Sequence, residues 1–569
     1  MKTKTEKKIY RFYFMLVIIA CASFVFTNVS YDAEYQLAMA YRMIKGDELI
    51  TQMWEPHQTS AFLCAILMKF YMVITGTTTG IVLYIQVMGL LIRGGISVFL
   101  YKTMRTFTEE KPAQVAAVLY LLLSPKDLLV PEFSNMQLWF GTLMLLMLIQ
   151  YLQKKRKVFL VLSAINLCLG IFSYPSFTLA YFAVCMILIR YCERWKKDIL
   201  LFTGICAAIG GSFAIYLLVH VGPDMLISCL SSALALEPSH TVSLAAKAGS
   251  HLLDILRILA FMTLIAGLGL LTEALICRIR GKKEEGKKSF MAESGVLISW
   301  YLLMAVFLIN ILSVKNRSGY SIPLLAIMLL GIWKRRELSE QEKCLYDSAL
   351  YIGIAHLAAT LLLSDHPFLP AVPYMLITVC VSVMPLYRWF QRLRENDSLK
   401  KRFLWGMHLF LILVLFKSIY IHTPISGRSQ IGSLLDDMAL IRSGPAMGII
   451  TDEAGAAKQR DSMKEWKQYI HEGDTIWILG EPVDTLGYLY EDVSVGAPTV
   501  MSTPTYNGKL LRYWEINPEK YPDVVILASG FGELQWDLSI NTWLMDWLEE
   551  EYCAETIIDG NYWRYYFKK

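Results

Sequence analysis

Charge is scarce in this sequence, and so are the short motifs of soluble enzymes. Charged residues make up 18% of the 569 residues, whereas soluble domains carry about 25%. The eleven cysteines are scattered and form no CxxC pair, which argues against a disulfide framework or a zinc site. Residues 422–569 contain no GxGxxG, Walker or GxSxG motif, so this region shows no self-contained catalytic motif.

Apolar residues are abundant instead. They make up 55% of the chain, and the mean hydropathy is +0.42. Apolar runs of roughly 18 or more residues recur along most of it, which is typical of a polytopic helical membrane protein. The basic N-terminus and the apolar run 14–26 resemble a signal peptide, but no A-x-A cleavage pattern follows. An uncleaved first span is therefore favoured.

The spacing of these runs predicts about thirteen membrane-spanning helices of roughly 17 to 25 residues. They begin near residues 12, 80, 113, 136, 158, 174, 198, 251, 291, 319, 347, 368 and 403. Clusters of Lys and Arg fall on one side of this topology, and the alternate connections are poor in basic residues. The positive-inside rule then predicts a cytoplasmic N-terminus, and we expect the protein in the cell (plasma) membrane. Residues 1–420 form the membrane domain, whose first loop, 29–79, is extracytoplasmic.

Residues 421–569 have the pattern of a small α/β domain, which an odd number of spans also places outside. From His422 onward this region has 12 basic and 23 acidic residues, a balance of −11. Short apolar segments at 447–451, 474–479 and 523–529 predict buried strands, and 462–473 and 540–552 have helical spacing. The last residues are predicted to close the sheet as a hairpin around Asp559 and Gly560. The fold class is therefore mainly α, with a C-terminal extracytoplasmic α/β domain.

The first outside loop concentrates acidic side chains and a histidine between apolar segments. They are Asp32, Glu34, Asp47, Glu48, Glu55 and His57. Residues 33–45 and 59–74 have the spacing of two amphipathic helices, and the second is better placed in the membrane interface than across the membrane. Asp32 and Glu34 suit the cap and first turn of the first helix. This purely structural interpretation leaves Glu55 and His57 unexplained.

In layout, this loop resembles the GT-C superfamily of polytopic glycosyltransferases, which use polyprenyl-phosphate sugars. The protein mannosyltransferases and the lipid A aminoarabinose transferases are examples. The shared features are an acidic motif outside the first span, an amphipathic helix ending in Gly-Asp, and a polar motif around Pro and His. The matching residues are Asp32, Glu34, Tyr35, Ala40, Met43, Gly46, Asp47, Glu55, Pro56 and His57. Two departures are Ala33 between the two acids and EPHQTSA in place of a double-proline element.

A second point of resemblance is the stretch 313–323, which is predicted to enter a span from outside. It contains Lys315, Arg317 and Tyr320, followed by Pro323. Many GT-C enzymes have a basic residue, Tyr and Pro at this turn, and the resemblance implies that the turn helps to hold the carrier phosphate. The planar guanidinium of arginine suits phosphate. The alternative is that the two basic side chains simply extend to the membrane surface.

Together these features predict a hexosyl- or pentosyltransferase of GT-C type that moves a sugar from a polyprenyl-phosphate carrier to a cell-surface acceptor. Asp32 and Glu34 are the candidate catalytic residues, with Asp32 as the base that accepts the proton of an acceptor hydroxyl. The candidate substrate-binding residues are Glu55, His57, Lys315, Arg317 and Tyr320.

The implied partners are a polyprenyl-phosphate-linked sugar donor, a glycan, lipid or protein acceptor, and membrane lipids, without nucleic acid. No cofactor is certain, and a divalent metal ion is left open. A transporter or lipid-linked glycan flippase is the alternative, since it would use polar residues near the bilayer midplane such as Arg93 and Arg257. A membrane scaffold that displays the C-terminal domain would need neither so many spans nor an acid-rich loop.

Overall fold

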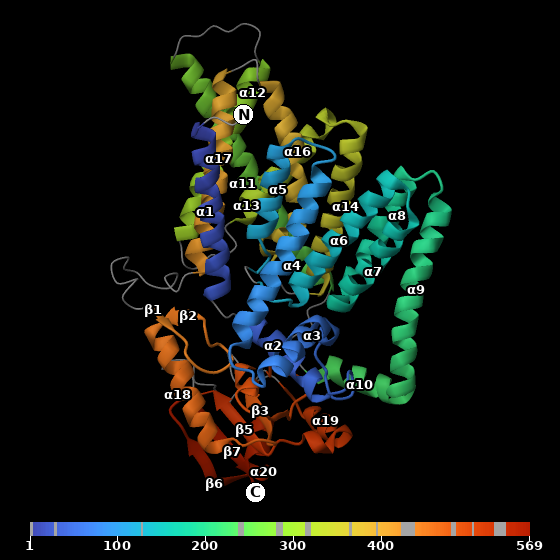
Figure 1. Ribbon diagram of the computed structural model, residues 1–569, viewed down its shortest axis with the longest axis vertical. Coiled ribbons are helices and arrows are strands. Elements are labelled where there is room, and N and C mark those ends of the chain that lie inside the picture. Colours follow the sequence, from blue (N-terminus) through green and yellow to red (C-terminus); the bar gives the residue numbers. More distant parts are fainter. Residues whose placement is uncertain are drawn as a thin grey trace.

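The computed structural model describes residues 4–27, 31–126, 129–236, 244–279, 288–312, 320–363, 367–393, 397–422, 438–479, 485–502, 506–528 and 542–569. A helical membrane region lies at one end of the long axis and a sheet-containing domain at the other (Figure 1). The two chain termini lie toward opposite ends of this axis (Figure 1).

Long apolar helices build the membrane region, because backbone groups in lipid must be satisfied within the segment. Among the described residues, ten helices are long and apolar enough to cross a membrane, so the chain is a multi-pass membrane protein. The helices of this region are α1 (Lys4–Phe26), α4 (Ile81–Met104), α5 (Glu110–Leu122), α6 (Phe133–Lys154), α7 (Lys157–Ser173), α8 (Leu179–Tyr191), α9 (Trp195–His220), α11 (Leu244–Ile279), α12 (Lys288–Leu312), α13 (Ser321–Lys334), α14 (Glu340–Leu363), α15 (Phe368–Ala371), α16 (Leu376–Arg392) and α17 (Asp397–His422). Short 3-10 turns among them are η2 (Pro175–Thr178), η4 (Arg335–Glu337) and η5 (Val372–Met375). Each predicted span start falls in or beside one of these elements, and the number that cross the membrane stays a prediction.

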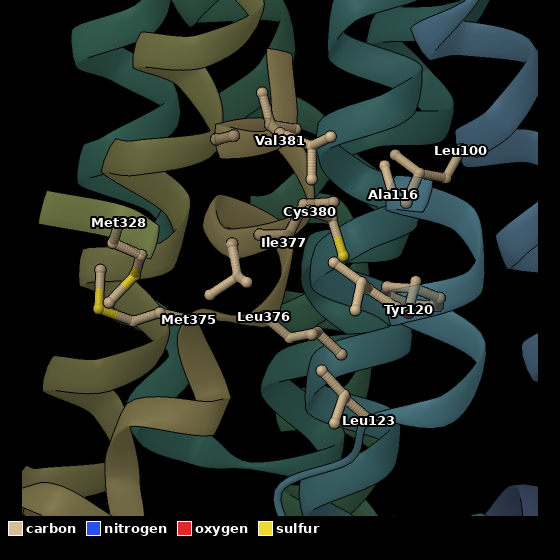
Figure 2. Packing of buried hydrophobic residues seen from close by; sticks show 14 of the residues in the cluster. Leu100, Ala116, Tyr120, Leu123, Met328, Met375, Leu376, Ile377, Cys380 and Val381 are labelled. Atoms are coloured by element: carbon tan, nitrogen blue, oxygen red, sulfur yellow. The ribbon is translucent and has the colours of Figure 1, made fainter. Parts of the chain in front are cut away.

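The centre of the bundle is filled by apolar side chains. Leu376, Ile377 and Cys380 of α16 lie between α5 on one side and Met328 of α13 on the other (Figure 2). All of these side chains are almost completely buried. Dense apolar packing of this kind favours charged chemistry at the ends of the helices, and the buried Arg93 of α4 is an exception.

The two arginines inside apparent spans both have local contacts. Arg93 is fully buried in α4, and its Nε donates to the Tyr120 carbonyl of α5 at 2.9 Å. Arg257 Nη1 lies 3.6 Å from Asp254 Oδ1, three residues earlier on the same helix. In both cases the arginine contacts a group of a neighbouring turn or helix.

The loop between α1 and α4 forms the two predicted helices, α2 (Tyr31–Lys45) and α3 (Ala61–Thr75), with the turn η1 (Gln58–Ser60) before α3. α2 already includes Tyr31, so Asp32 lies in its first turn and not at the capping position. Both helices lie between the membrane bundle and the sheet domain (Figure 1). Phe62, Ile66 and Phe70 of α3 are exposed at a spacing of four residues, which gives this helix an apolar outer stripe.

The C-terminal domain contains a five-stranded sheet in the order β4-β3-β5-β7-β6. β3 is parallel to β4 and β5, whereas β7 is antiparallel to β5 and β6. The β6–β7 pair confirms the hairpin predicted around Asp559 and Gly560. The elements of the domain are β1 (Met438–Leu440), β2 (Ile450–Asp452), α18 (Glu453–Tyr469), β3 (Thr475–Leu479), η9 (Thr485–Leu489), β4 (Ser494–Val495), α19 (Leu510–Ile516), η10 (Pro518–Lys520), β5 (Val524–Ala528), α20 (Thr542–Glu551), β6 (Tyr552–Asp559) and β7 (Trp563–Lys568).

The first loop and the C-terminal domain share one hydrophobic core. Leu37 of α2 and Met68 of α3 are fully buried in the same cluster as Ile478 of β3 and Leu489. α10 (Pro223–Leu236), which turns inward from the end of α9, also approaches the domain (Figure 1). The loop is therefore positioned as much by the C-terminal domain as by the membrane helices.

Candidate functional site

Three charged side chains from separate segments meet where the first loop joins the membrane region. Lys126 Nζ lies 3.1 Å from Asp32 Oδ2 and 3.9 Å from Glu132 Oε2. Asp32 lies in the first turn of α2, and Lys126 lies in the connection between α5 and α6. Glu132 is the residue directly before α6. The ammonium also lies 4.0 Å from the centroid of the Phe133 ring, a cation–π distance. One cation thus holds two carboxylates together.

Glu132 is fully buried and caps the N-terminus of α6. Its carboxylate accepts hydrogen bonds from the Ser134 amide at 2.9 Å, the Ser134 hydroxyl at 3.0 Å and the Asn135 amide at 2.7 Å. These amides belong to the first turn and have no partner within the helix. Burial raises the pKa of Glu132, and the positive charge of Lys126 and these amides oppose that shift.

His57 lies in an aromatic stack beside this cluster. Its ring centroid is 4.4 Å from that of Phe133 and 4.9 Å from that of Tyr174, with the planes inclined by 16° and 14°. Its Nδ1 atom is buried and has no hydrogen-bond partner among the residues that the structure describes. Burial, reinforced by the charge of Lys126 and opposed by Asp32, lowers the pKa of His57 to about 4. His57 is therefore neutral at pH 7.

The connection that carries Lys126 is held by neighbouring helices. Tyr320, at the start of α13, donates its hydroxyl to the Ser124 carbonyl at 2.8 Å. On the other side the connection lies directly on α4, where a β-carbon at Gly89 would be only 1.7 Å from the Leu129 carbonyl oxygen. Glycine is required there because any side chain would collide with the backbone of the connection.

Glu55 lies at the contact between the first loop and the C-terminal domain. Its Oε1 accepts hydrogen bonds from Arg42 Nη1 at 3.0 Å and from the Val500 amide at 3.1 Å. The buried Arg42 also donates to Asp47 Oδ2 at 2.7 Å, and Lys520 Nζ lies 2.5 Å from Asp47 Oδ1. Burial raises the pKa of Glu55, and Arg42 opposes that shift. This network joins α2 to the sheet domain.

The structure brings only some of the predicted site residues together at the Lys126 ammonium. Asp32 contacts Lys126 directly, and His57 lies against the aromatic ring that the Lys126 ammonium also contacts. Glu34 follows Asp32 by two positions in α2, and residues at that spacing face different directions. Lys315 and Arg317 lie outside the described residues. The chemical roles of all seven predicted site residues, Glu55 and Tyr320 included, stay predictions.

Sequence reasoning misses Lys126, Glu132 and the two rings that enclose His57. Lys126 could have been noticed as a basic residue in a connection that the predicted topology places outside and that is otherwise poor in basic residues. The acid at position 132 follows a proline and precedes Phe-Ser-Asn at the start of an apolar run, a pattern that indicates a helix N-terminus. Neither signal identifies a partner, because the residues that meet are far apart along the chain.

The fold and this site define a multi-pass membrane protein in which the loop between α1 and α4 packs against a C-terminal α/β domain. No family model and no curated protein matches the sequence. Among solved structures the chain is similar to an oligosaccharyltransferase from Archaeoglobus fulgidus in complex with Zn and sulfate, with 11% identity, 90% of this chain and 68% of that chain covered, and a TM-score of 0.44. It is also similar to ArnT from Cupriavidus metallidurans bound to undecaprenyl phosphate, with 10% identity, 98% of both chains covered and a TM-score of 0.44. At such scores the likeness transfers no residue and no role to this chain.

Proposed function

We propose that this protein is a membrane glycosyltransferase that moves a sugar from a polyprenyl-phosphate carrier to an acceptor at the outer surface of the membrane. The observation that carries the proposal is the Asp32 carboxylate, held by Lys126 beside Glu132 at the junction of the helical bundle and the α/β domain. A lipid-borne head group lies at this level, where the apolar helices end. A glycan, lipid or protein acceptor approaches the same level from the aqueous side.

In the proposed reaction, the bond between the sugar C1 and the phosphate oxygen breaks, and its electron pair leaves with the lipid phosphate. The acceptor oxygen forms the new bond to C1, and its proton passes to Asp32. A base is needed because a hydroxyl is a weak nucleophile. The contact with Lys126 at 3.1 Å holds the Asp32 carboxylate in place at the end of the membrane helices.

The remaining predicted residues have supporting roles in this proposal. Lys315 and Arg317 neutralise the phosphate as the bond breaks, and Tyr320 lies at the same turn. Glu34 is the second catalytic carboxylate, and the neutral His57 contributes to acceptor binding. The sugar is a hexose or a pentose.

Substitution of Asp32 by Asn tests the proposal. The amide keeps the size of the side chain but does not accept a proton, so transfer is expected to fall about a hundredfold to ten-thousandfold. Protein yield and donor binding should stay unchanged. The matched control is Glu48→Gln, because Glu48 is an exposed carboxylate in the same loop.

The assay is a mass-spectrometric comparison of lipid-linked sugars and cell-surface glycans with and without the gene. Normal transfer by Asp32→Asn would refute the role of Asp32 as the base. An unchanged glycan profile together with altered uptake of small molecules would refute the transferase and favour the transporter.

We also propose that the C-terminal domain faces the outside of the plasma membrane and that the N-terminus is cytoplasmic. The alternation of basic clusters along the sequence supports this orientation. A cysteine at Glu472, exposed between α18 and β3, should react with a membrane-impermeant maleimide in intact cells. A cysteine at Glu193, exposed between α8 and α9, should react only after the membrane is opened. The reverse pattern would contradict the orientation.

A further inference from the structure

We propose that the Lys126 ammonium is the resident cation of this site, standing between Asp32 and Glu132 in the place that a divalent metal ion would otherwise take. The inference rests on the proposed function, because it concerns the same two carboxylates. It answers the question, left open by the sequence, of whether the reaction needs a metal ion.

The position of the ammonium is defined from three sides. Its Nζ is 3.1 Å from an Asp32 oxygen, 3.9 Å from a Glu132 oxygen and 4.0 Å from the centre of the Phe133 ring. The Lys126 side chain is only 16% exposed, so it is held in place by its surroundings. A cation bound between the two carboxylates would meet this ammonium as a like charge.

The donor atoms of the site also fit a metal ion poorly. Both oxygens of Glu132 already accept hydrogen bonds from the backbone and the hydroxyl at the start of α6. Within the described part of the chain, no group of three or more His, Cys, Asp or Glu side chains could hold a metal ion. Mg²⁺ and Ca²⁺ need six or more oxygen ligands, and a site for them usually supplies several carboxylates or carbonyls.

Lys126 acts in this scheme through Asp32, as a positioning residue. It neutralises one of two neighbouring negative charges and fixes the direction of the Asp32 carboxylate. Without it, two carboxylates would face each other with no cation between them, an arrangement that attracts a divalent ion from solution. The substitution Lys126→Ala should therefore let the site bind a divalent ion weakly, because Glu132 keeps its hydrogen bonds to the start of α6 and water must supply most of the ligands.

The test uses the purified full-length protein and Mn²⁺ as the probe. Lys126→Ala is expected to bind one Mn²⁺ detectably by electron paramagnetic resonance, whereas the wild-type protein and the control Lys69→Ala, which removes an exposed lysine of α3, are not. Adding Asp32→Asn to Lys126→Ala should abolish that binding. Lys126→Gln, which keeps most of the side-chain volume, serves as a second variant should the alanine form fail to fold.

Transfer activity gives the second readout. Transfer by the wild-type protein should be insensitive to EDTA. Lys126→Ala should lower transfer about ten- to a hundredfold, as expected for a lost positioning contact. Mn²⁺ or propylammonium should restore part of the transfer activity of this variant. Lys126→Arg should retain most activity without added metal. Wild-type transfer that is abolished by EDTA and restored by Mn²⁺ would overturn the inference. So would Mn²⁺ binding to Lys126→Ala and Lys126→Gln no tighter than to the wild type. Because Mn²⁺ binding is measured without turnover, failure of the proposed function would show separately, as an absence of transfer in every variant.

Discussion

Substitution of Glu55 by Ala is expected to loosen the C-terminal domain from the first loop. The Glu55 carboxylate is buried and accepts hydrogen bonds from Arg42 on α2 and from the Val500 amide of the C-terminal domain. Immediately beside it, the Trp54 amide donates to the Pro498 carbonyl at 2.8 Å. One side chain therefore contributes to both sides of the contact between loop and domain.

The magnitude follows from what the substitution leaves behind. The Val500 amide loses its acceptor in a buried position, at a cost of about 1–3 kcal/mol. A hydrogen bond to a charged partner, worth about 1.5–3 kcal/mol, is also lost. Arg42 keeps its ion pair with Asp47, so the cost stays toward the lower part of the summed range. A loss of about 3 kcal/mol lowers the ratio of docked to undocked protein about a hundredfold.

Hydrogen exchange followed by mass spectrometry measures this change in detergent-solubilised protein. Peptides that cover residues 49–56 and 499–502 should exchange about a hundredfold faster in Glu55→Ala if exchange proceeds through undocking. Glu55→Gln, which keeps an acceptor oxygen, should show a smaller effect. Glu48→Ala is the control, because that carboxylate is exposed on the same loop. Unchanged protection in Glu55→Ala would refute the structural role assigned to this carboxylate.

Three further predictions follow from other parts of the structure. Gly89→Ala should reduce transfer, because its β-carbon would displace the connection before α6. Gly94→Ala is the control, because that position of the same helix has open space beside it. Equal activity of the two variants would contradict the close contact between Gly89 and the connection. The pKa of His57 is lowered to about 4 in the folded protein from the ordinary 6.5. On acidification the unfolded chain therefore binds this proton at a higher pH than the folded protein does. The free energy of unfolding should fall as the pH drops from about 6.5 to about 4. His57→Phe should flatten that part of the melting-temperature profile, and an unaltered profile would show that His57 does not cause it. Glu465→Ala should destabilise the C-terminal domain by about 3 kcal/mol or more, because three backbone amides of the β6–β7 turn lose their acceptor. The control is Lys464→Ala, which removes the exposed side chain next to Glu465 and should leave the unfolding midpoint unchanged.

The local structure of this protein could be predicted from the sequence because its causes are local. Apolar runs in a membrane must form helices, since lipid offers no partner for the backbone. The amphipathic spacing of residues 33–45 and 59–74 corresponds to α2 and α3, and the short apolar runs near 475 and 524 correspond to β3 and β5. Even the terminal hairpin follows from its turn residues.

The partners of the charged side chains were decided only by the tertiary structure. Asp32 and Glu55 are both acids of the same loop, and the sequence makes both of them candidates for chemistry. Packing brings Asp32 to Lys126 at the end of the membrane helices, whereas Glu55 lies in the domain contact with Arg42. The energy of a buried charge depends on which opposite charges and donors surround it. Those neighbours come from segments far apart along the chain, so no local pattern in the loop specifies them.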